Sequence, residues 1–189
     1  PLQDPSGTII RGQHAVVVSG TSAGASADGF TLNSNGNVLQ GIFISQFDGT
    51  GVLVYGDNNV IGTDGDGNED GLEGNSIHSN GEYGVMIRGG RGNWVAGNFI
   101  GLSLDGEHDY GNGQEGILIL ADATSNLIGT NGDGTSDDLE RNVISGNAKE
   151  GIYILQEGSE NNVIAGNYIG TNAAGDAAIP NAYNGIRIQ

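Results

Sequence analysis

The sequence has 189 residues, enough for one domain with a sizeable core, and 36 of them are Gly while only 3 are Pro. It has no Cys, which excludes disulfides and thiolate metal sites, and no apolar run approaches the ~18 residues that a membrane span needs. The 23 acidic and 6 basic residues give a net charge of −17, so nucleic acid and anionic lipid are poor partners.

The first predicted elements are two short apolar runs, 8–10 and 15–18. We interpret them as degenerate strands of an incomplete first repeat, followed by a loop of small residues over 19–28. The chain starts at Pro1 without a signal-like segment and ends inside an alternating apolar run. We therefore expect residues 1–189 to form a single domain that is a segment of a longer chain.

From residue 29 onward, three short signatures recur in a fixed order. The first is a Gly followed by an alternating apolar strand, the second is an Asn followed by two apolar residues, and the third is a short segment that ends in Ile. First signatures begin at Gly29, Gly51, Gly84, Gly116, Gly151 and Gly185. Second signatures begin at Asn37, Asn59, Asn93, Asn126 and Asn162. Third signatures end at Ile44, Ile77, Ile100, Ile144 and Ile169.

The spacing of these signatures predicts the architecture. The shortest gaps are 8, 5 and 9 residues, which make a circuit of 22, and insertions of 11 and 9 residues alternate between two different corners. Three short strands per circuit are typical of an all-β parallel β-helix solenoid, in which each strand pairs with its equivalent one circuit later. An α-helical solenoid would need a 3.6-residue apolar period, which no window shows, and few Gly.

Alternation within the strands predicts which side chains point inward. The inward set consists of Val52, Val54, Val85, Ile87, Ile117, Ile119, Ile152, Ile154, Ile186 and Ile188, together with the five Ile residues of the third signatures. Four Asn residues stand where the second strand turns into the third: Asn75, Asn98, Asn142 and Asn167. They are either ordinary turn residues or a hydrogen-bonded ladder along the axis, and Ile42 interrupts the series at one end.

The phrases NVISGN (142–147), VIAGNYIGTNAAGDAAIPN (163–181) and NGIRI (184–188) resemble the repeats of the pectate-lyase-like right-handed β-helix superfamily. The resemblance is closest to large Gly/Asn-rich secreted or surface proteins of bacteria. It implies right-handed coiling, an extracellular or cell-surface location and surroundings rich in carbohydrate. It implies no particular activity, because this fold carries lyases, hydrolases, epimerases, adhesins and passive stalks.

The 11-residue insertions are the most acidic segments and are the candidate metal sites. Oxygen ligands at every second residue with Gly between them suit Ca²⁺, and 66–71 matches the first half of an EF-hand loop without its closing Glu. The predicted ligands are Asp64, Asp66, Asn68 and Asp70 in the first insertion and Asp133, Asp137, Asp138 and Glu140 in the second. The alternative is a pair of solvated acidic loops that bind no ion.

The outward side of the first strands is mostly apolar and offers no carboxylate. A lyase needs a base and charge stabilisation, and a glycoside hydrolase needs two carboxylates, so this face argues against catalysis. The polar binding candidates on it are Tyr55, Arg88, Tyr153 and Arg187. His14, His78 and His108 share no circuit or row, so a histidine metal site is not expected.

Two functions of different classes remain. The first is a non-catalytic extracellular module, a stalk, adhesin or carbohydrate-contacting segment that Ca²⁺ stabilises or that associates end to end, with flanking domains, sister chains or polysaccharide as partners. The second is a fragment of a polysaccharide-active enzyme, a lyase, epimerase or hydrolase that acts on uronic-acid-rich glycan. The strong negative charge opposes the second function unless Ca²⁺ bridges substrate carboxylates to the acidic loops.

Overall fold

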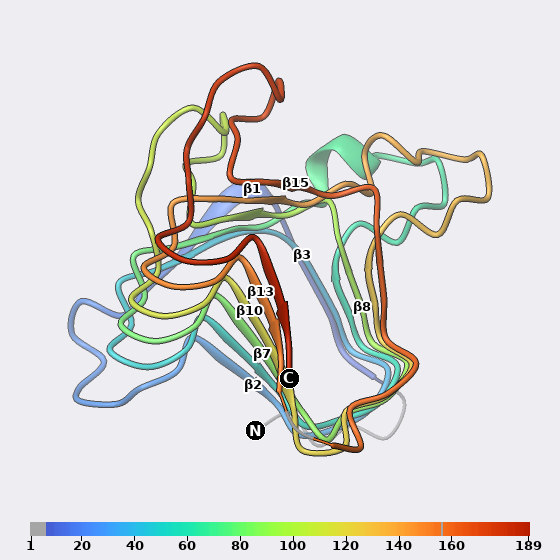
Figure 1. Cartoon of the computed structure of the whole chain (residues 1–189), viewed down its shortest axis with the longest axis horizontal. Helices are drawn as coiled ribbons and strands as arrows, with labels where there is room; N and C mark the ends of the chain where they lie inside the picture. Colours follow the sequence, from blue (N-terminus) through green and yellow to red (C-terminus); the bar gives the residue numbers. More distant parts are fainter. Residues whose placement is uncertain (1–6, 156) are drawn as a thin grey trace.

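In the computed structural model, which describes residues 7–155 and 157–189, every pair of strands is parallel, and the sheets curl around a common interior (Figure 1). The helical structure among these residues is one short 3₁₀-helix, η1 (Asp70–Leu72). The prediction of an all-β, parallel-strand fold with repeating units is thus confirmed. No helix of the described residues is long and apolar enough to cross a membrane.

The first signatures form a six-stranded sheet. In spatial order its strands are β16 (Ile186–Ile188), β13 (Ile152–Ile154), β10 (Ile117–Leu120), β7 (Val85–Arg88), β4 (Val52–Val54) and β2 (Phe30–Leu32). Spatial neighbours are therefore one circuit apart in sequence.

The second and third signatures form a ten-stranded sheet around β3 (Val38–Ser45), which serves as second and third strand at once. The second strands on one side of β3 are β5 (Val60–Gly62), β8 (Trp94–Ala96), β11 (Leu127–Gly129) and β14 (Val163–Ala165). The third strands on its other side are β6 (Ser76–His78), β9 (Phe99–Ile100), β12 (Val143–Ile144) and β15 (Tyr168–Ile169).

The strand β1 (Ile9–Ser19) pairs with β3 and combines the two N-terminal apolar runs. Ile9 faces Val38 in the second-strand part of β3, and Val16 faces Ile42 in the third-strand part, with a register shift between Arg11 and Val16. The interpretation of these runs as degenerate second and third strands is confirmed.

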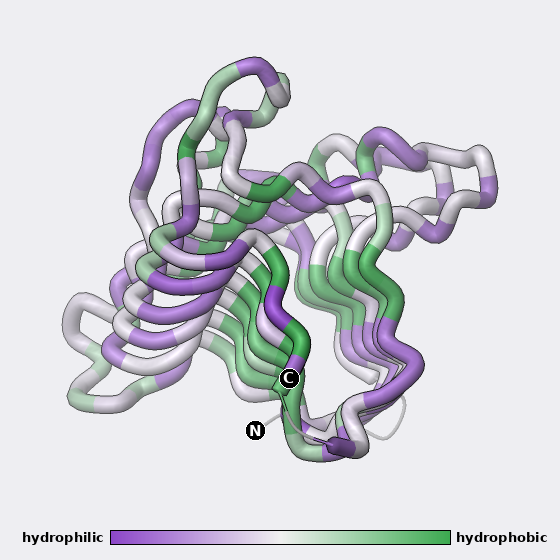
Figure 2. The backbone as a smooth tube through the Cα atoms, in the orientation of Figure 1, coloured by the Kyte–Doolittle hydropathy of each residue, from purple (hydrophilic) through white to green (hydrophobic). Residues whose placement is uncertain are grey.

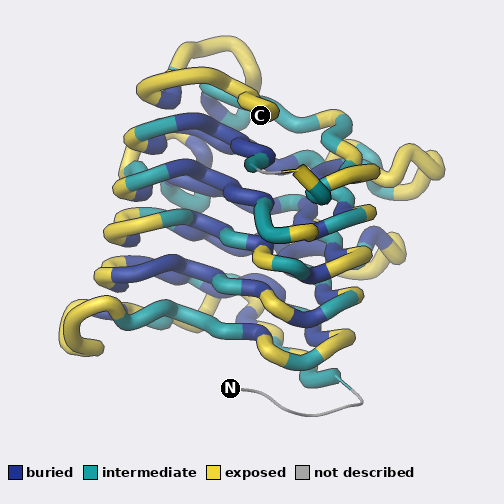
Figure 3. Tube along the Cα trace, turned by 60° about the horizontal axis from the view of Figure 1, so that its bottom comes forward, coloured by how far each residue is buried: buried dark blue, intermediate teal, exposed yellow. Residues whose placement is uncertain are grey.

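The core consists of aliphatic columns that cross the circuits. Val54, Ile87, Ile119 and Ile154 are successive partners in the ladder of the first sheet, and all four are buried. Figures 2 and 3 show apolar, buried segments of successive circuits lying over one another. The predicted inward residues are buried except on the last circuit, where Ile169 is half-buried and Ile186 and Ile188 on the edge strand β16 are 45% and 74% exposed.

A ladder of Asn side chains runs along each of the three corners of the circuits. At each step, both the backbone N–H and the Nδ2 of one Asn donate to Oδ1 of the Asn one circuit later, over 2.7 to 3.2 Å. The ladder between second and third strands is the predicted one, Asn75, Asn98, Asn142 and Asn167. The ladder before the second strands consists of Asn37, Asn59, Asn93, Asn126 and Asn162. The ladder after the third strands consists of Asn80, Asn112, Asn147 and Asn181.

The ladders also satisfy the backbone of the strands. Asn98 Nδ2 donates to the Ile61 carbonyl at 2.8 Å, and Asn142 Nδ2 donates to the Val95 carbonyl at the same distance. At the N-terminal end of the predicted ladder, the backbone N–H of Ile42 donates to Asn75 Oδ1 at 3.0 Å, so Ile42 closes the series. Buried polar backbone at the corners thus finds partners without water.

Glycine ends the second strands β5 and β11 because the neighbouring circuit passes too close for a side chain. Gly62 and Gly129 have φ of 102° and 104°, and a Cβ on them would lie 1.7 Å from the Ala96 carbonyl oxygen and 1.9 Å from that of Ala165. Only Gly tolerates both the positive φ and this approach.

Removing one rung tests the energetic weight of a ladder. Asn98→Ala removes the acceptor of the buried Asn75 backbone N–H and the Nδ2 donor of the Ile61 carbonyl. Asn75 Nδ2 and Asn142 Oδ1 each lose one partner and keep another. Because a buried, unpaired group costs roughly 1–3 kcal/mol and a lost hydrogen bond about 1 kcal/mol, we expect the free energy of unfolding to fall by about 2–4 kcal/mol in urea titrations. The exposed Asn33→Ala should change it by less than about 0.5 kcal/mol, and equal effects of the two variants would contradict the structural role of the ladder.

Candidate functional site

The two acidic insertions, residues 63–73 and 130–140, project from the corner between second and third strands (Figure 1). The circuit between them makes a short turn at Gly97, where a Cβ would lie 2.7 Å from the Leu139 carbonyl oxygen and 3.0 Å from Thr63 Cγ2. The insertions therefore straddle this turn and approach each other.

Three acidic side chains of the first insertion converge on one point. One oxygen each of Asp64, Asp70 and Glu73 lies within 4.8 Å of the others, and the side chains of Asp70 and Glu73 are buried. We call these three residues the acidic cluster. Such a cluster of carboxylates can hold a metal ion.

Backbone groups of the loop orient two members of the cluster. The N–H of Gly67 donates to Asp70 Oδ2 at 3.1 Å, and the N–H of Asp64 donates to Glu73 Oε2 at 3.2 Å. The Thr63 hydroxyl donates to the same Glu73 oxygen at 3.1 Å. The loop is therefore folded around these carboxylates.

The electrostatics of the cluster are unfavourable to a third charge. Burial raises the pKa of Glu73, the charges of Asp64 and Asp70 raise it further, and the hydrogen bonds from Asp64 and Thr63 oppose these effects. Neutralising the Glu73 carboxylate, or placing a cation beside it, removes the unfavourable free energy of this buried negative charge.

Only part of the predicted ligand set for the first insertion gathers there. Asp64 and Asp70 belong to the acidic cluster, whereas Asp66 and Asn68 are exposed, and Asp66 Oδ1 accepts the backbone N–H of Asn68 at 2.7 Å. The alternation of oxygen ligands thus serves a local turn. The third member of the acidic cluster is Glu73, which the sequence reasoning did not select. Glu73 stands two residues before the ladder residue Asn75, just as Glu140 stands two residues before Asn142, and this shared position was the available signal.

The second insertion repeats the loop shape without the cluster. Asn131 stands where the first insertion has Asp64, its N–H donates to Glu140 Oε2 at 2.8 Å, and Asp137 Oδ1 accepts the Thr130 hydroxyl at 3.0 Å. Asp133 and Asp138 are exposed, and Asp138 pairs with Arg141 at 3.2 Å. Within the described residues, the carboxylate cluster of metal-binding dimensions is confined to the first insertion.

The four predicted binding residues of the first-strand face fall into two separate places. Arg187 faces Tyr153 across β16 and β13, and its guanidinium lies 4.7 Å from the centre of the Tyr153 ring. Tyr55 directly follows β4, Arg88 is the last residue of β7, and both are exposed. They lie in another row, in which Arg88 faces Leu120. The structure thus brings Arg187 into contact with Tyr153, while Tyr55 and Arg88 follow the paired residues Val54 and Ile87 on successive circuits.

A pocket of about 240 Å³ next to this pair contains carboxylates that the sequence reasoning missed. Its lining consists of Glu115, Lys149, Glu150, Tyr153, Tyr183 and Arg187. Glu115 and Glu150 each precede the Gly that opens a first strand, on consecutive circuits, so they are one strand spacing of about 4.8 Å apart along the axis. Both are buried, and Arg187 pairs with Glu150 at 3.2 Å. Burial and the charge of Glu115 raise the pKa of Tyr83 at the same edge.

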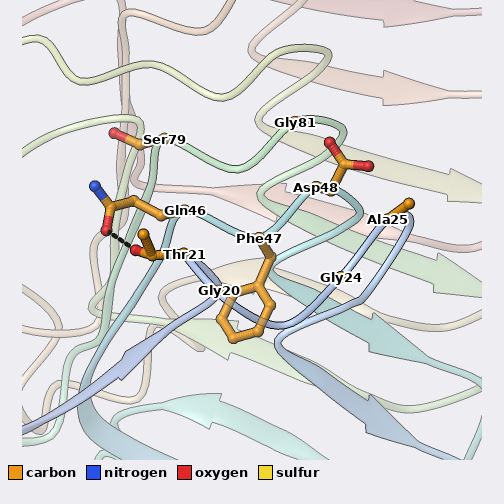
Figure 4. A pocket seen from close by; sticks show the side chains of 9 residues that line it. All are labelled: Gly20, Thr21, Gly24, Ala25, Gln46, Phe47, Asp48, Ser79 and Gly81. Carbon is orange, nitrogen blue, oxygen red and sulfur yellow. Dashed lines mark hydrogen bonds between the residues drawn. The ribbon is translucent and has the colours of Figure 1, made fainter.

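A second hollow, lined by the residues labelled in Figure 4, lies beside the 19–28 loop. Its polar groups largely bond to one another: Gln46 Oε1 accepts the hydroxyls of Thr21 at 2.8 Å and of Ser19 at 3.0 Å. Asp48 Oδ2 accepts the backbone N–H of Ser26 at 2.9 Å. This hollow therefore brings no acid–base pair together.

Comparison with known proteins finds no family model, no curated protein and no solved structure that matches the chain.

The raised pKa of Glu73 predicts a pH-dependent stability difference. A carboxyl whose pKa is higher in the folded than in the unfolded state stabilises the fold below its unfolded pKa, near 4.5, and loses that contribution as the pH rises through the folded value. Glu73→Gln cannot ionise, so its stability does not fall as the pH rises through the pKa of Glu73, and its amide oxygen still accepts from Asp64 and Thr63. Measured without divalent cations, the melting temperature of the variant relative to wild type should therefore increase from pH 4 to pH 7. A difference in melting temperature that is constant, or that shrinks as the pH rises, would contradict the raised pKa of Glu73.

Proposed function

We propose that the chain is a right-handed parallel β-helix and serves as a non-catalytic extracellular module, a stalk, adhesin or carbohydrate-contacting segment of a larger secreted or surface protein. The observation that carries the proposal is the unbroken register of all three Asn ladders. Strands one circuit apart pair in parallel throughout, which is the pairing of a β-helix. The resemblance of the repeats to pectate-lyase-like surface proteins supports the handedness and the location.

The use of buried polar residues supports a mechanical role. The Asn side chains of the ladders form hydrogen bonds between circuits. The outward rows of the first strands are largely aliphatic, with Leu118 buried and Met86 half-buried. Each circuit contacts only its neighbours, so every added circuit contributes its own interface to the stability of the rod. The exposed edge residues Val163, Ile186 and Ile188 suit a flanking segment or a sister chain as partner.

A polysaccharide-active enzyme is the second candidate, and the pocket at Glu115 and Glu150 favours it. Two carboxylates with Tyr153 and Tyr183 nearby are a set that hydrolyses or binds sugar rings in other proteins. Arg187 and Asn184, however, both donate to Glu150 Oε1, at 3.2 and 3.4 Å, so one oxygen of this carboxylate already has structural partners. We therefore rank this function below the structural one.

Assays on acidic and neutral glycans separate the two functions. We expect the wild-type chain to release neither unsaturated uronides from pectin or alginate nor reducing ends from a polysaccharide panel. Turnover that disappears in Glu115→Gln and Glu150→Gln, but persists in Arg88→Ala on the same face, would overturn the proposal and identify the pocket as an active site. Release of unsaturated uronides would then indicate a lyase, and release of reducing ends without them a hydrolase.

A further inference from the structure

We propose that the acidic cluster, together with Gln40 of strand β3, is a binding site for a single hard divalent cation, best suited to Ca²⁺. The site fastens the first insertion to the sheet of the preceding circuit. It differs from the EF-hand-like ligand set of the sequence because Glu73 and Gln40 replace Asp66 and Asn68. It does not depend on the proposed function of the chain.

Gln40 is the observation that lies outside the cluster and points to a ligand. Gln40 is 1% exposed, and its Nε2 donates a hydrogen bond to Asp64 Oδ2 at 3.4 Å, which places its terminal amide against the acidic cluster. Its neighbour Gly41 donates a backbone hydrogen bond to the Glu73 carbonyl at 2.6 Å, which holds β3 against the end of the insertion. The buried carbonyl oxygen of the amide, Oε1, has no hydrogen-bond partner among the described residues.

Buried oxygens of the cluster are equally unpartnered. Asp64 Oδ1 and Asp70 Oδ1 are shielded from solvent and have no donor within the described part of the chain, although the second oxygen of each carboxylate is bonded. A buried acceptor without a donor costs free energy, and a cation satisfies several of them at once. The loop thus leaves one oxygen of each aspartate for a ligand.

The charge of the site matches a divalent cation. Three carboxylates carry −3, and Arg11, whose Nη2 lies 3.6 Å from Asp64 Oδ2, supplies +1. The buried carboxylate of Glu140 next to Gly65 adds to this excess of negative charge, which Ca²⁺ or Mg²⁺ reduces. The cluster supplies hard oxygen ligands from two Asp and one Glu, and the Gln40 amide beside them carries a fourth. Ca²⁺ completes its six to eight ligands with water more readily than Mg²⁺ accommodates an irregular site.

The chain provides its own reporter and its own control. Its one Trp, Trp94, lies beside Gly65, the residue that follows Asp64, because a Cβ on Gly65 would lie 2.9 Å from Trp94 Cη2. Tb³⁺, which replaces Ca²⁺ at oxygen sites, should therefore emit when Trp94 is excited. Asp64→Asn copies the second insertion, where Asn131 already occupies this position in a folded loop.

The test titrates the purified chain with Tb³⁺ and then displaces Tb³⁺ with Ca²⁺ or Mg²⁺, with calorimetry of CaCl₂ as a second readout. We expect one saturable site that prefers Ca²⁺, an affinity at least about tenfold weaker in Asp64→Asn and Asp70→Asn, and a weaker affinity in Gln40→Leu. Asp66→Asn, the matched control in the exposed part of the loop, should bind within about twofold of wild type. Circular dichroism verifies that each variant is folded. If Asp70→Asn does not fold, the comparison of Asp64→Asn with Asp66→Asn still tests the site.

Two results would overturn the site. One is the absence of saturable Tb³⁺ and Ca²⁺ binding by folded wild-type protein at millimolar metal. The other is an Asp66→Asn variant that loses as much affinity as Asp64→Asn, because it would place the ion in the exposed stretch predicted from the sequence.

Discussion

The structure depends on one repeated interaction, in which Oδ1 of an Asn accepts the backbone and side-chain N–H groups of the Asn one circuit before. Each corner of a circuit turns the chain sharply, which exposes backbone groups that no sheet can pair. The Asn side chain supplies those groups with partners from the adjacent circuit while it stays buried. A slip of one residue between circuits would break all three ladders together and turn the aliphatic columns outward, so the ladders and the core specify the same register.

The ladders also explain where the chain can grow without disturbing the core. Insertions leave and re-enter the circuit next to a ladder Asn, as at Asn75 and Asn142, so the corner is closed whether the connection is short or long. Insertions on alternate circuits then have room to lie across the short turn between them. Chemistry collects at these corners and at the edge of the first sheet, because the strand interiors are committed to packing.

The sequence predicted the repeating part of the molecule well. The strands, the column from Val54 to Ile154 and the ladder from Asn75 to Asn167 all follow from periodic spacing, which records contacts one circuit apart. The other two ladders were missed, although the Asn residues of one open the second signatures and those of the other follow the third strands. In sequence, an Asn that only forms a turn and an Asn that belongs to a ladder have the same local pattern. Gln40, Glu115 and Glu150 were missed because their partners lie on another strand or circuit, and only the stacked structure brings them together. Glu73 was missed because its partners Thr63 and Asp64 stand ten and nine residues earlier in the same insertion, and only the fold of that loop brings them together. The alternating oxygen-bearing side chains of Asp66 and Asn68 misled in the opposite direction, because their pattern forms a local turn and not a ligand set.

Native-state hydrogen exchange tests the central role of the ladders most directly. If the ladders hold the circuits in register, the backbone amides of Asn59, Asn93, Asn98 and Asn142 exchange only when the whole domain unfolds, as slowly as the amides of the buried strands. The amide of Asn68, bonded within an exposed turn, exchanges orders of magnitude faster. Ladder amides that exchanged at the rate of Asn68 would show that the corners open independently of the core and would contradict this account.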